Sequence, residues 1–355
     1  MKGTYQDQYA KILENLISEY DKKVTNRNGV TRSRFFETIK VNLQDEFPLM
    51  DIKTIKWTNI VSELLWFLNG DTNIKYLRDN GCKIWDDDSY NYYTRKYSGE
   101  GGKLTKEEFL KNVDRGKTIA VTDDKNASKY DKYRYYTFGD LDRVYGKQWV
   151  DFGGSVNQIE NTITLLKNDP NNRRIIVTAH NPKDIQDDIV GLPSCHNMFQ
   201  FYTTPMIKAE RSLWAVENLS NNIDIFSDSD LDKHGVPKHF VSLWFNLRSN
   251  DFFLGQPYNM ASYSLLLYII GNITNMVPKN VACSMIDCHL YEDHIKAANT
   301  WINRYNSLKN IGEDIHCDAK LVITKKLKTT KNLELSDFII ENYKPGGHIS
   351  APLLT

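Results

Sequence analysis

The sequence lacks the features that mark membrane, secreted and nucleic-acid-binding proteins. Its longest apolar run, Leu265–Ile270, is far shorter than the roughly twenty residues that a membrane-spanning helix needs. The N-terminal residues lack the apolar core of a signal peptide. The 45 Lys and Arg residues balance 45 Asp and Glu residues, so no net charge would attract nucleic acid or an anionic membrane. We therefore expect a cytoplasmic protein that needs neither a membrane nor nucleic acid.

Metal-binding and dinucleotide-binding patterns are also missing. The five cysteines include no C-x-x-C pair, and no His-rich spacing accompanies them. An odd number of unpaired cysteines suits a reducing compartment, and without these spacings we expect no metal. The chain has no G-x-G-x-x-G loop and no regular alternation of strands and helices, which argues against a dinucleotide-binding fold.

The 355 residues, 41% of them hydrophobic, suffice for a sizeable core. Hydrophobic periodicity predicts both helices and strands, and hence a mixed α/β (α+β) fold. The predicted helices are 5–20, 57–68, 156–166, 259–276 and 291–305, and the predicted strands are 173–178, 240–247 and 281–290, with a further strand after Cys195.

Two polar segments, 89–138 and 206–236, resemble insertions into this framework. Long polar stretches are usually surface excursions, although a lid or a partner surface is the alternative. Candidate functional residues lie on both sides of each segment. We therefore expect a single domain, 1–355, that carries two surface insertions.

Cys195 and His196 follow a Gly-Pro turn and precede an apolar, strand-like run. A cysteine held there, with arginines available to stabilise a thiolate, is a candidate nucleophile. A buried structural cysteine is the alternative that residue type alone favours.

Several other polar residues suggest an anion site and a proton-transfer site. Guanidinium groups bind phosphate through paired donors, although any one arginine could instead form a surface salt bridge. A carboxylate on an apolar helix face, such as Glu63, is a candidate for a raised pKa, or else an amphipathic boundary residue. The remaining candidates, each alternatively a hydrogen-bonded core residue, are Arg27, Arg173, Arg174, Arg248, Ser249, Asp251, Asn259, His289 and Tyr291.

These segments occur in one order along nearly the whole chain, and together they resemble the thymidylate synthases. The stretches that carry the resemblance are Val41–Pro48, Glu63–Asn73, Val144–Trp149, Leu166–Pro170, Arg173–Val177, Cys195–His196, Arg248–Asp251, Leu254–Gly255, Asn259–Tyr263, His289–Tyr291 and Ala351–Thr355. The resemblance implies a bent, mixed sheet that packs against helices and dimerises through its outer face.

The resemblance also implies the chemistry. Cys195 would add to C6 of dUMP, beside His196, and Asn259 would select uracil over cytosine. Glu63 and Tyr145 would assist proton transfer. The phosphate would be bound by Arg27, Arg248 and Ser249, and by Arg173 and Arg174 from the partner in a homodimer, while His289 and Tyr291 would hold the sugar 3′-hydroxyl.

The co-substrate implied is 5,10-methylenetetrahydrofolate. Asp251 would hold the pterin ring, and Lys53 would meet the glutamate tail. The other positions that match folate contacts are Ile84, Trp85, Leu254, Gly255, Tyr258 and the closing residue Thr355.

Three positions depart from the usual synthase pattern: Leu247, His180 and the pair Met285–Ile286. They leave open a related hydroxymethylase that makes 5-hydroxymethyl-dUMP. A non-catalytic dimer that binds nucleotide or RNA is a more distant alternative.

Overall fold

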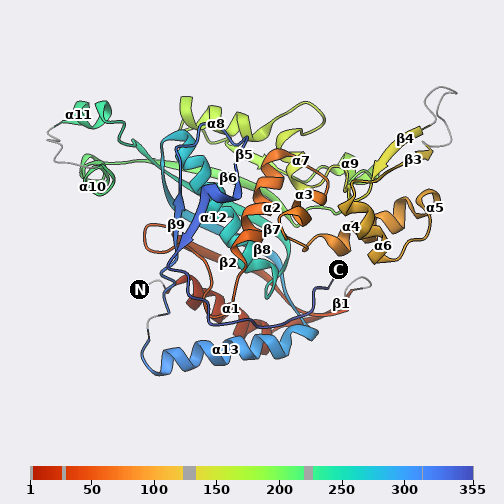
Figure 1. The fold of residues 1–355 in the computed structure, drawn as a ribbon. Coiled ribbons are helices and arrows are strands. Elements are labelled where there is room, and N and C mark those ends of the chain that lie inside the picture. Colours follow the sequence, from red (N-terminus) through yellow and green to blue (C-terminus); the bar gives the residue numbers. More distant parts are fainter. Residues whose placement is uncertain (1–2, 26–28, 123–132, 220–226, 314, 355) are drawn as a thin grey trace. The chain divides into compact units, whose positions relative to one another are not determined.

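The computed structural model describes residues 3–25, 29–122, 133–219, 227–313 and 315–354 (Figure 1). The chain forms two compact units that interleave along the sequence. The sheet unit comprises Met1–Ile55, Glu160–Val177 and Met198–Pro352, and the helical unit comprises Lys56–Ile159, Thr178–Asn197 and Leu353–Thr355. That the whole chain is one domain stays a prediction.

The sheet unit is built on a six-stranded sheet in the order β1-β2-β8-β7-β6-β5. Strand β7 runs parallel to β8, whereas β2 runs antiparallel to it, so the sheet is mixed as predicted. The strands are β1 (Asp21–Thr25), β2 (Gly29–Asn42), β5 (Ile176–Thr178), β6 (His196–Pro205), β7 (His239–Asp251) and β8 (Val277–Tyr291).

Strand pairing is interrupted along one row of this sheet. The β2–β8 register passes from Phe35–Asp287 to Glu37–Met285, and the β7–β8 register passes from Leu247–Met285 to Ser249–Asp287. Phe36, in this row, has a φ of 60°. Such irregularities bend strands and increase their twist, and they therefore support the bend that the resemblance implies.

Helices cover one face of the sheet (Figure 1). Helix α12 (Gly255–Thr274) packs on β7 and β8, and α1 (Tyr5–Ser18) packs on β2 beside α13 (Ile295–Asn310). Along β7, alternate side chains from Leu243 to Leu247 are buried, whereas Trp244 and Asn246 are only half-buried. The departures Leu247 and Met285 are therefore core positions, which explains their apolar character.

The second predicted insertion, 206–236, has a small core of its own. Ala215 of α10 (Lys208–Asn218) packs with Leu231 of α11 (Asp228–Lys233) and with Val236. The buried guanidinium of Arg211 forms ion pairs with Asp228 and Asp232. The sheet unit also contains α8 (Gln158–Asn168), which begins in the helical unit, and β9 (Lys320–Ile323), β10 (Phe338–Glu341), η1 (Glu292–His294) and η2 (Leu335–Asp337).

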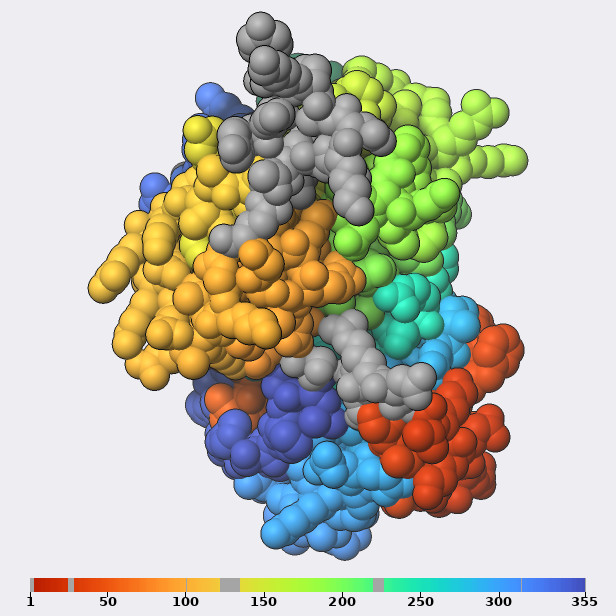
Figure 2. All heavy atoms as spheres, turned by 90° about the vertical axis from the view of Figure 1, so that its right-hand side faces the viewer, coloured from red at the N-terminus to blue at the C-terminus, as the bar shows by residue number. Residues whose placement is uncertain are grey.

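The helical unit contains α2 (Trp57–Asn69), α3 (Lys75–Asp79), α4 (Asp86–Lys96), α5 (Ser98–Gly101), α6 (Lys106–Asp114), β3 (Thr118–Thr122), β4 (Tyr133–Thr137), α7 (Tyr145–Val150) and α9 (Pro182–Gln186). Its first predicted insertion, 89–138, also has a core, in which Tyr93, Phe109, Tyr136 and Phe138 pack together. The orange-to-yellow spheres of α4–α6 lie side by side in Figure 2. Both insertions therefore fold into packed structure in their described parts.

A glycine sets the approach of α7 to α2. A Cβ added at Gly146 would lie 2.3 Å from the Phe67 Cα, much closer than two carbons can pack. Gly70 ends α2 with a φ of 64°, in the left-handed region that favours glycine. The close α2–α7 contact fixes the position of Tyr145, the first residue of α7.

Several predicted boundaries differ from the structure, and two of these differences have a local cause. The strand predicted at 173–178 begins only at Ile176, because the Asn172 side chain accepts the Arg174 N–H and forms a turn. The helix predicted from Tyr291 begins at Ile295, because Tyr291 still pairs with Thr31 in the sheet.

Candidate active site

Cys195 lies just before β6 in the helical unit. It is half-buried, whereas Cys82, Cys283, Cys288 and Cys317 are buried. Burial raises the pKa of each of those four thiols, that of Cys82 to about 11. Because a thiolate is the attacking species, Cys195 is the cysteine best suited to act as a nucleophile.

The Cys195 backbone is held by Tyr145. Its N–H donates to the Tyr145 hydroxyl oxygen, with 2.8 Å between the two atoms. The Tyr145 ring stacks on Phe67 at 5.3 Å and lies 4.3 Å from the His196 ring. Burial lowers the pKa of His196 to about 3, so this imidazole is neutral at physiological pH. The structure thus places three predicted residues, Cys195, Tyr145 and His196, side by side.

Glu63 of α2 pairs with Trp85. The indole N–H donates to Glu63 Oε1 at 2.7 Å. Burial raises the pKa of Glu63 to about 7, and the bond from Trp85 opposes this shift. A carboxyl group with such a pKa exists in both protonation states near neutral pH, as a proton-transfer group requires. The Trp85 ring also meets the Tyr145 ring edge-on at 5.5 Å, while its neighbour Ile84 is half-buried.

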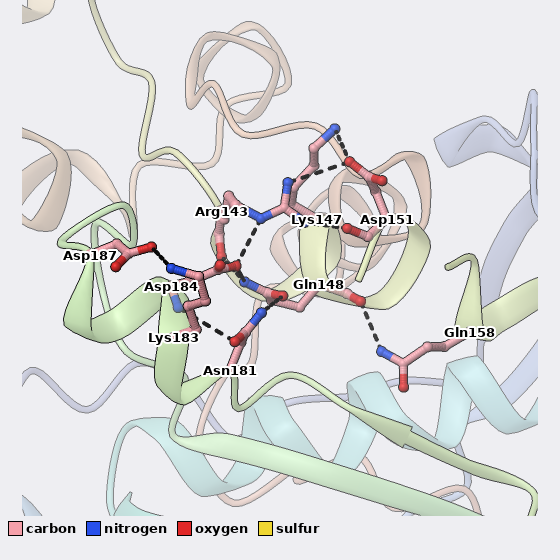
Figure 3. Close-up of polar contacts among 9 residues, drawn as sticks. All are labelled: Arg143, Lys147, Gln148, Asp151, Gln158, Asn181, Lys183, Asp184 and Asp187. Carbon is pink, nitrogen blue, oxygen red and sulfur yellow. Dashed lines mark hydrogen bonds and ion pairs between the residues drawn. The ribbon is translucent and has the colours of Figure 1, made fainter. Parts of the chain in front are cut away.

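A buried polar network beside α7 was missed by the sequence analysis (Figure 3). Asp184 of α9 accepts hydrogen bonds from Arg143 and Gln148, both at 2.8 Å. Asn181 caps α9 by accepting the Asp184 N–H at 3.4 Å. Only this helix-capping Asn before Pro182 was recognisable in the sequence. The network anchors the N-terminus of α7, where Tyr145 lies.

Four of the predicted nucleotide-binding residues lie toward the C-terminal ends of the parallel strands β7 and β8, namely Arg248, Ser249, His289 and Tyr291. Ser249 is in register with Asp287, and Asp251 with His289. The His289 and Tyr291 rings lie 5.1 Å apart, edge to face. Both rings are buried, whereas Ser249 is half-buried.

Asp251 is the last residue of β7, four positions before α12 begins. Its Oδ1 accepts the N–H groups of Phe253 and Leu254 at 3.1 and 3.0 Å, whereas Oδ2 has no hydrogen-bond partner among the described residues. A Cβ added at Gly255 would lie 3.7 Å from both Asn259 Oδ1 and Asp251 Cβ. Asp251, Gly255 and Asn259 therefore converge, and Leu254 and Tyr258 lie half-buried in the same turn.

Lys53 and His294 flank Asp251. The buried Lys53 ammonium donates to the Phe253 carbonyl, and burial lowers its pKa to about 7 while Asp251 opposes the shift. His294, which the sequence analysis missed, is fully buried with Nδ1 3.7 Å from Asp251 Oδ1 and Nε2 2.8 Å from the Pro352 carbonyl. The predicted role of Lys53 at a glutamate tail stays a prediction.

The predicted phosphate ligands lie on the surface. Arg173, Arg174 and Arg248 are exposed, which leaves their guanidinium groups accessible to a ligand or a second chain. Arg27 and Thr355 fall outside the described residues.

The Thymidylate synthase family model matches residues 4–355. The chain belongs to the thymidylate synthase family. Among the relatives, the thymidylate synthase of Listeria monocytogenes is 30% identical over 98% of both chains. That of Mycoplasma genitalium is 33% identical over 84% of this chain and 85% of its own, and that of the Aster yellows witches'-broom phytoplasma is 32% identical over 90% of each.

This family membership defines the activity. Thymidylate synthases are methyltransferases, so the comparisons support methyl transfer over the hydroxymethylase alternative. In the described part of the chain, no helix combines the length and apolar character needed to cross a bilayer. Nor do the described residues include a cluster of three or more side chains suited to a metal ion.

Proposed function

We propose that this thymidylate synthase joins a one-carbon unit to C5 of dUMP through a covalent bond between Cys195 Sγ and C6 of the uracil. Attack at C6 makes C5 nucleophilic, so that C5 can bond to the one-carbon unit and then lose its proton. After hydride transfer to this unit, departure of Cys195 Sγ from C6 restores the C5–C6 double bond and frees the thiolate. 5,10-Methylenetetrahydrofolate would supply the methylene group and the hydride, leaving dTMP and dihydrofolate. The observation that carries this proposal is the partly accessible Cys195 held by Tyr145.

The neighbouring groups have the protonation states that the reaction needs. Glu63, with a pKa of about 7, can pass a proton to and from the base through water. The Tyr145 hydroxyl lies beside the nucleophile and would assist removal of the C5 proton. The neutral His196 places no competing charge beside Cys195.

Recognition of dUMP would come from the sheet unit. The amide of Asn259 offers one donor and one acceptor to the uracil edge, and this pairing disfavours cytosine. His289 and Tyr291 would hold the sugar hydroxyl. Arg27, Arg248 and Ser249 would bind the phosphate with charge-assisted hydrogen bonds.

The residues around Asp251 fit a pterin ring. Asp251 Oδ2 has no partner among the described residues, and it would accept hydrogen bonds from the N–H groups of the pterin. Gly255 leaves room for the ring beside Asn259. Ile84, Trp85, Leu254 and Tyr258 would supply its apolar contacts, with Lys53 at the glutamate tail and Thr355 closing over the folate.

We also propose that the enzyme is a cytoplasmic homodimer. The sheet unit carries accessible apolar side chains, including Phe35 of β2 and Tyr202 of β6, which are 81% and 67% exposed. A second copy of this chain would cover them, and exposed Arg173 and Arg174 would reach its phosphate site. The five free cysteines suit the reducing cytoplasm.

One assay tests the chemistry. The protein is incubated with dUMP and 5,10-methylenetetrahydrofolate, the nucleotide product is identified by mass, and dihydrofolate is followed by absorbance. We expect dTMP and dihydrofolate in equal amounts, and neither from Cys195→Ser. A 5-hydroxymethyl product with tetrahydrofolate would support the hydroxymethylase instead, and dUMP binding without turnover would support the non-catalytic alternative.

A further inference from the structure

We propose that helix α4 of the first insertion positions the nucleophile by holding the loop that carries Cys195 through Asp142. The proposal concerns the helical unit alone, and it rests on the proposed function only for the role of Cys195. If the proposal holds, the first insertion contributes to catalysis by positioning the nucleophile, whereas a segment that only decorates the surface would not.

The Asp142 carboxylate accepts hydrogen bonds from three side chains, two of them in α4 and one in the residue that follows it. The Tyr92 hydroxyl donates to Oδ2, the Lys96 ammonium lies 3.2 Å from the same oxygen, and the Tyr97 hydroxyl lies 3.3 Å from it. Burial, followed by the contact with Asp142, raises the pKa of Tyr92. Tyr92 therefore stays protonated and remains a hydrogen-bond donor.

The backbone around Asp142 pairs directly with the segment that leads to Cys195. Asp142 forms an antiparallel bridge with Val190. On either side of this bridge, the Arg143 N–H donates to the Ile189 carbonyl at 3.0 Å and the Gly191 N–H donates to the Leu141 carbonyl at 2.8 Å. A displacement of Asp142 would therefore move residues 189–191 with it.

Helix α4 also holds this segment directly. The Lys96 ammonium donates to the Asp188 carbonyl, and Arg95 forms an ion pair with the Asp188 carboxylate at 3.0 Å. Asp142 and Asp188 have φ angles of 54° and 52°, a region that costs free energy for residues other than glycine. The contacts from α4 stabilise both unfavourable conformations.

The two residues held together at the active site follow these anchors closely. Tyr145 follows Asp142 by three positions and Cys195 follows Gly191 by four. Two connections therefore join the same two segments of the chain. One is the Asp142–Val190 bridge, and the other is the hydrogen bond from the Cys195 N–H to the Tyr145 hydroxyl. Catalysis depends on such geometry, since a displacement of about 1 Å can cost roughly 100-fold in rate.

A matched pair of variants separates positioning from general stability. Tyr92→Phe removes the hydroxyl that meets Asp142. Tyr90→Phe removes a hydroxyl from the same helix, one that bonds at 2.8 Å to the Leu104 carbonyl within the insertion. Hydrogen exchange of the backbone amides of residues 189–195 is measured for both full-length proteins, together with kcat and KM for dUMP.

We expect Tyr92→Phe to speed exchange at Gly191 and Cys195 by about 10-fold or more, and to lower kcat by a similar factor with KM for dUMP within about 3-fold. Tyr90→Phe should leave both quantities near those of the unmodified protein. Unchanged exchange in Tyr92→Phe, or equal effects of the two variants, would overturn the proposal. If the unmodified protein makes no dTMP, the proposed function fails, while the exchange comparison still decides whether α4 holds the loop.

Discussion

The indole N–H of Trp85 donates to Glu63 Oε1 at 2.7 Å, in surroundings that raise the pKa of this carboxyl to about 7. Because the folded pKa exceeds the ordinary value of 4.5, folding favours the protonated form, and Glu63 destabilises the protein increasingly as the pH rises from about 4.5 to 7. Glu63→Gln keeps an acceptor for Trp85 and removes the ionisation. We expect it to raise the free energy of unfolding at pH 8 by roughly 1–2 kcal/mol, which is less than the full shift implies because the side chain retains some solvent access.

Urea unfolding of both proteins at pH 5 and pH 8 tests this expectation. The difference between them should shrink at pH 5, where Glu63 is protonated in the folded protein and its ionisation no longer costs stability there. Turnover of dUMP should nevertheless fall by about 100-fold or more at each pH, because glutamine transfers no proton. A stability difference that is equal at the two pH values would contradict the assigned protonation behaviour.

Tyr145→Phe tests the link to the nucleophile. The substitution leaves the Cys195 N–H without its acceptor and removes a hydroxyl from the reacting centre. We expect kcat to fall by about 100-fold or more with little change in dUMP affinity, measured by steady-state kinetics and calorimetry. Tyr135→Phe, at a tyrosine that is 76% exposed, serves as the control and should keep full activity.

Gly146→Ala tests the close contact between α7 and α2. The added methyl group would collide with the Phe67 backbone, so α7 must shift. We expect a loss of about 3 kcal/mol in the free energy of unfolding, measured with urea. Gly99→Ala, where no atom lies within 4 Å of the added Cβ, should change it by less than about 1 kcal/mol; similar losses in both variants would argue against the contact.

Mixed dimers test whether the active site is shared between subunits. Cys195→Ser and the double variant Arg173→Ala/Arg174→Ala are each expected to be inactive as homodimers. If the arginines act in the partner's site, a heterodimer of the two contains one intact site and regains activity. Purification by two different affinity tags followed by a turnover assay measures this. A heterodimer as inactive as its parents would place the arginines in their own subunit's site or outside it.

The sequence predicted elements best where hydrophobic periodicity and tertiary packing agree. The helix predicted at 57–68 is confirmed as Trp57–Asn69, because its apolar stripe faces the core and a glycine ends it. The strand predicted at 240–247 continues to Asp251, since pairing with β8 carries polar residues along the sheet. The cores within 89–138 and 206–236 were not predicted, because their aromatic and aliphatic residues are scattered among polar ones without a clear period.

The sequence indicates candidate site residues, whose roles stay predictions, but it does not indicate the contacts that hold them. Cys195 and Glu63 have motif neighbours that identify them. His294 and Asp184 are buried polar residues whose partners, Pro352 and Gln148, lie far along the chain. Their roles depend on tertiary proximity, which neither spacing nor composition encodes.

The burial of four of the five cysteines has a practical consequence for experiments in solution. Cys82, Cys283, Cys288 and Cys317 combine poor access with raised thiol pKa values, and so react slowly with maleimides at neutral pH. The wild-type chain therefore already carries a single preferred site for a fluorophore or spin label, at Cys195. Protection of that label site by a bound nucleotide would report occupancy of the active centre without any engineered cysteine.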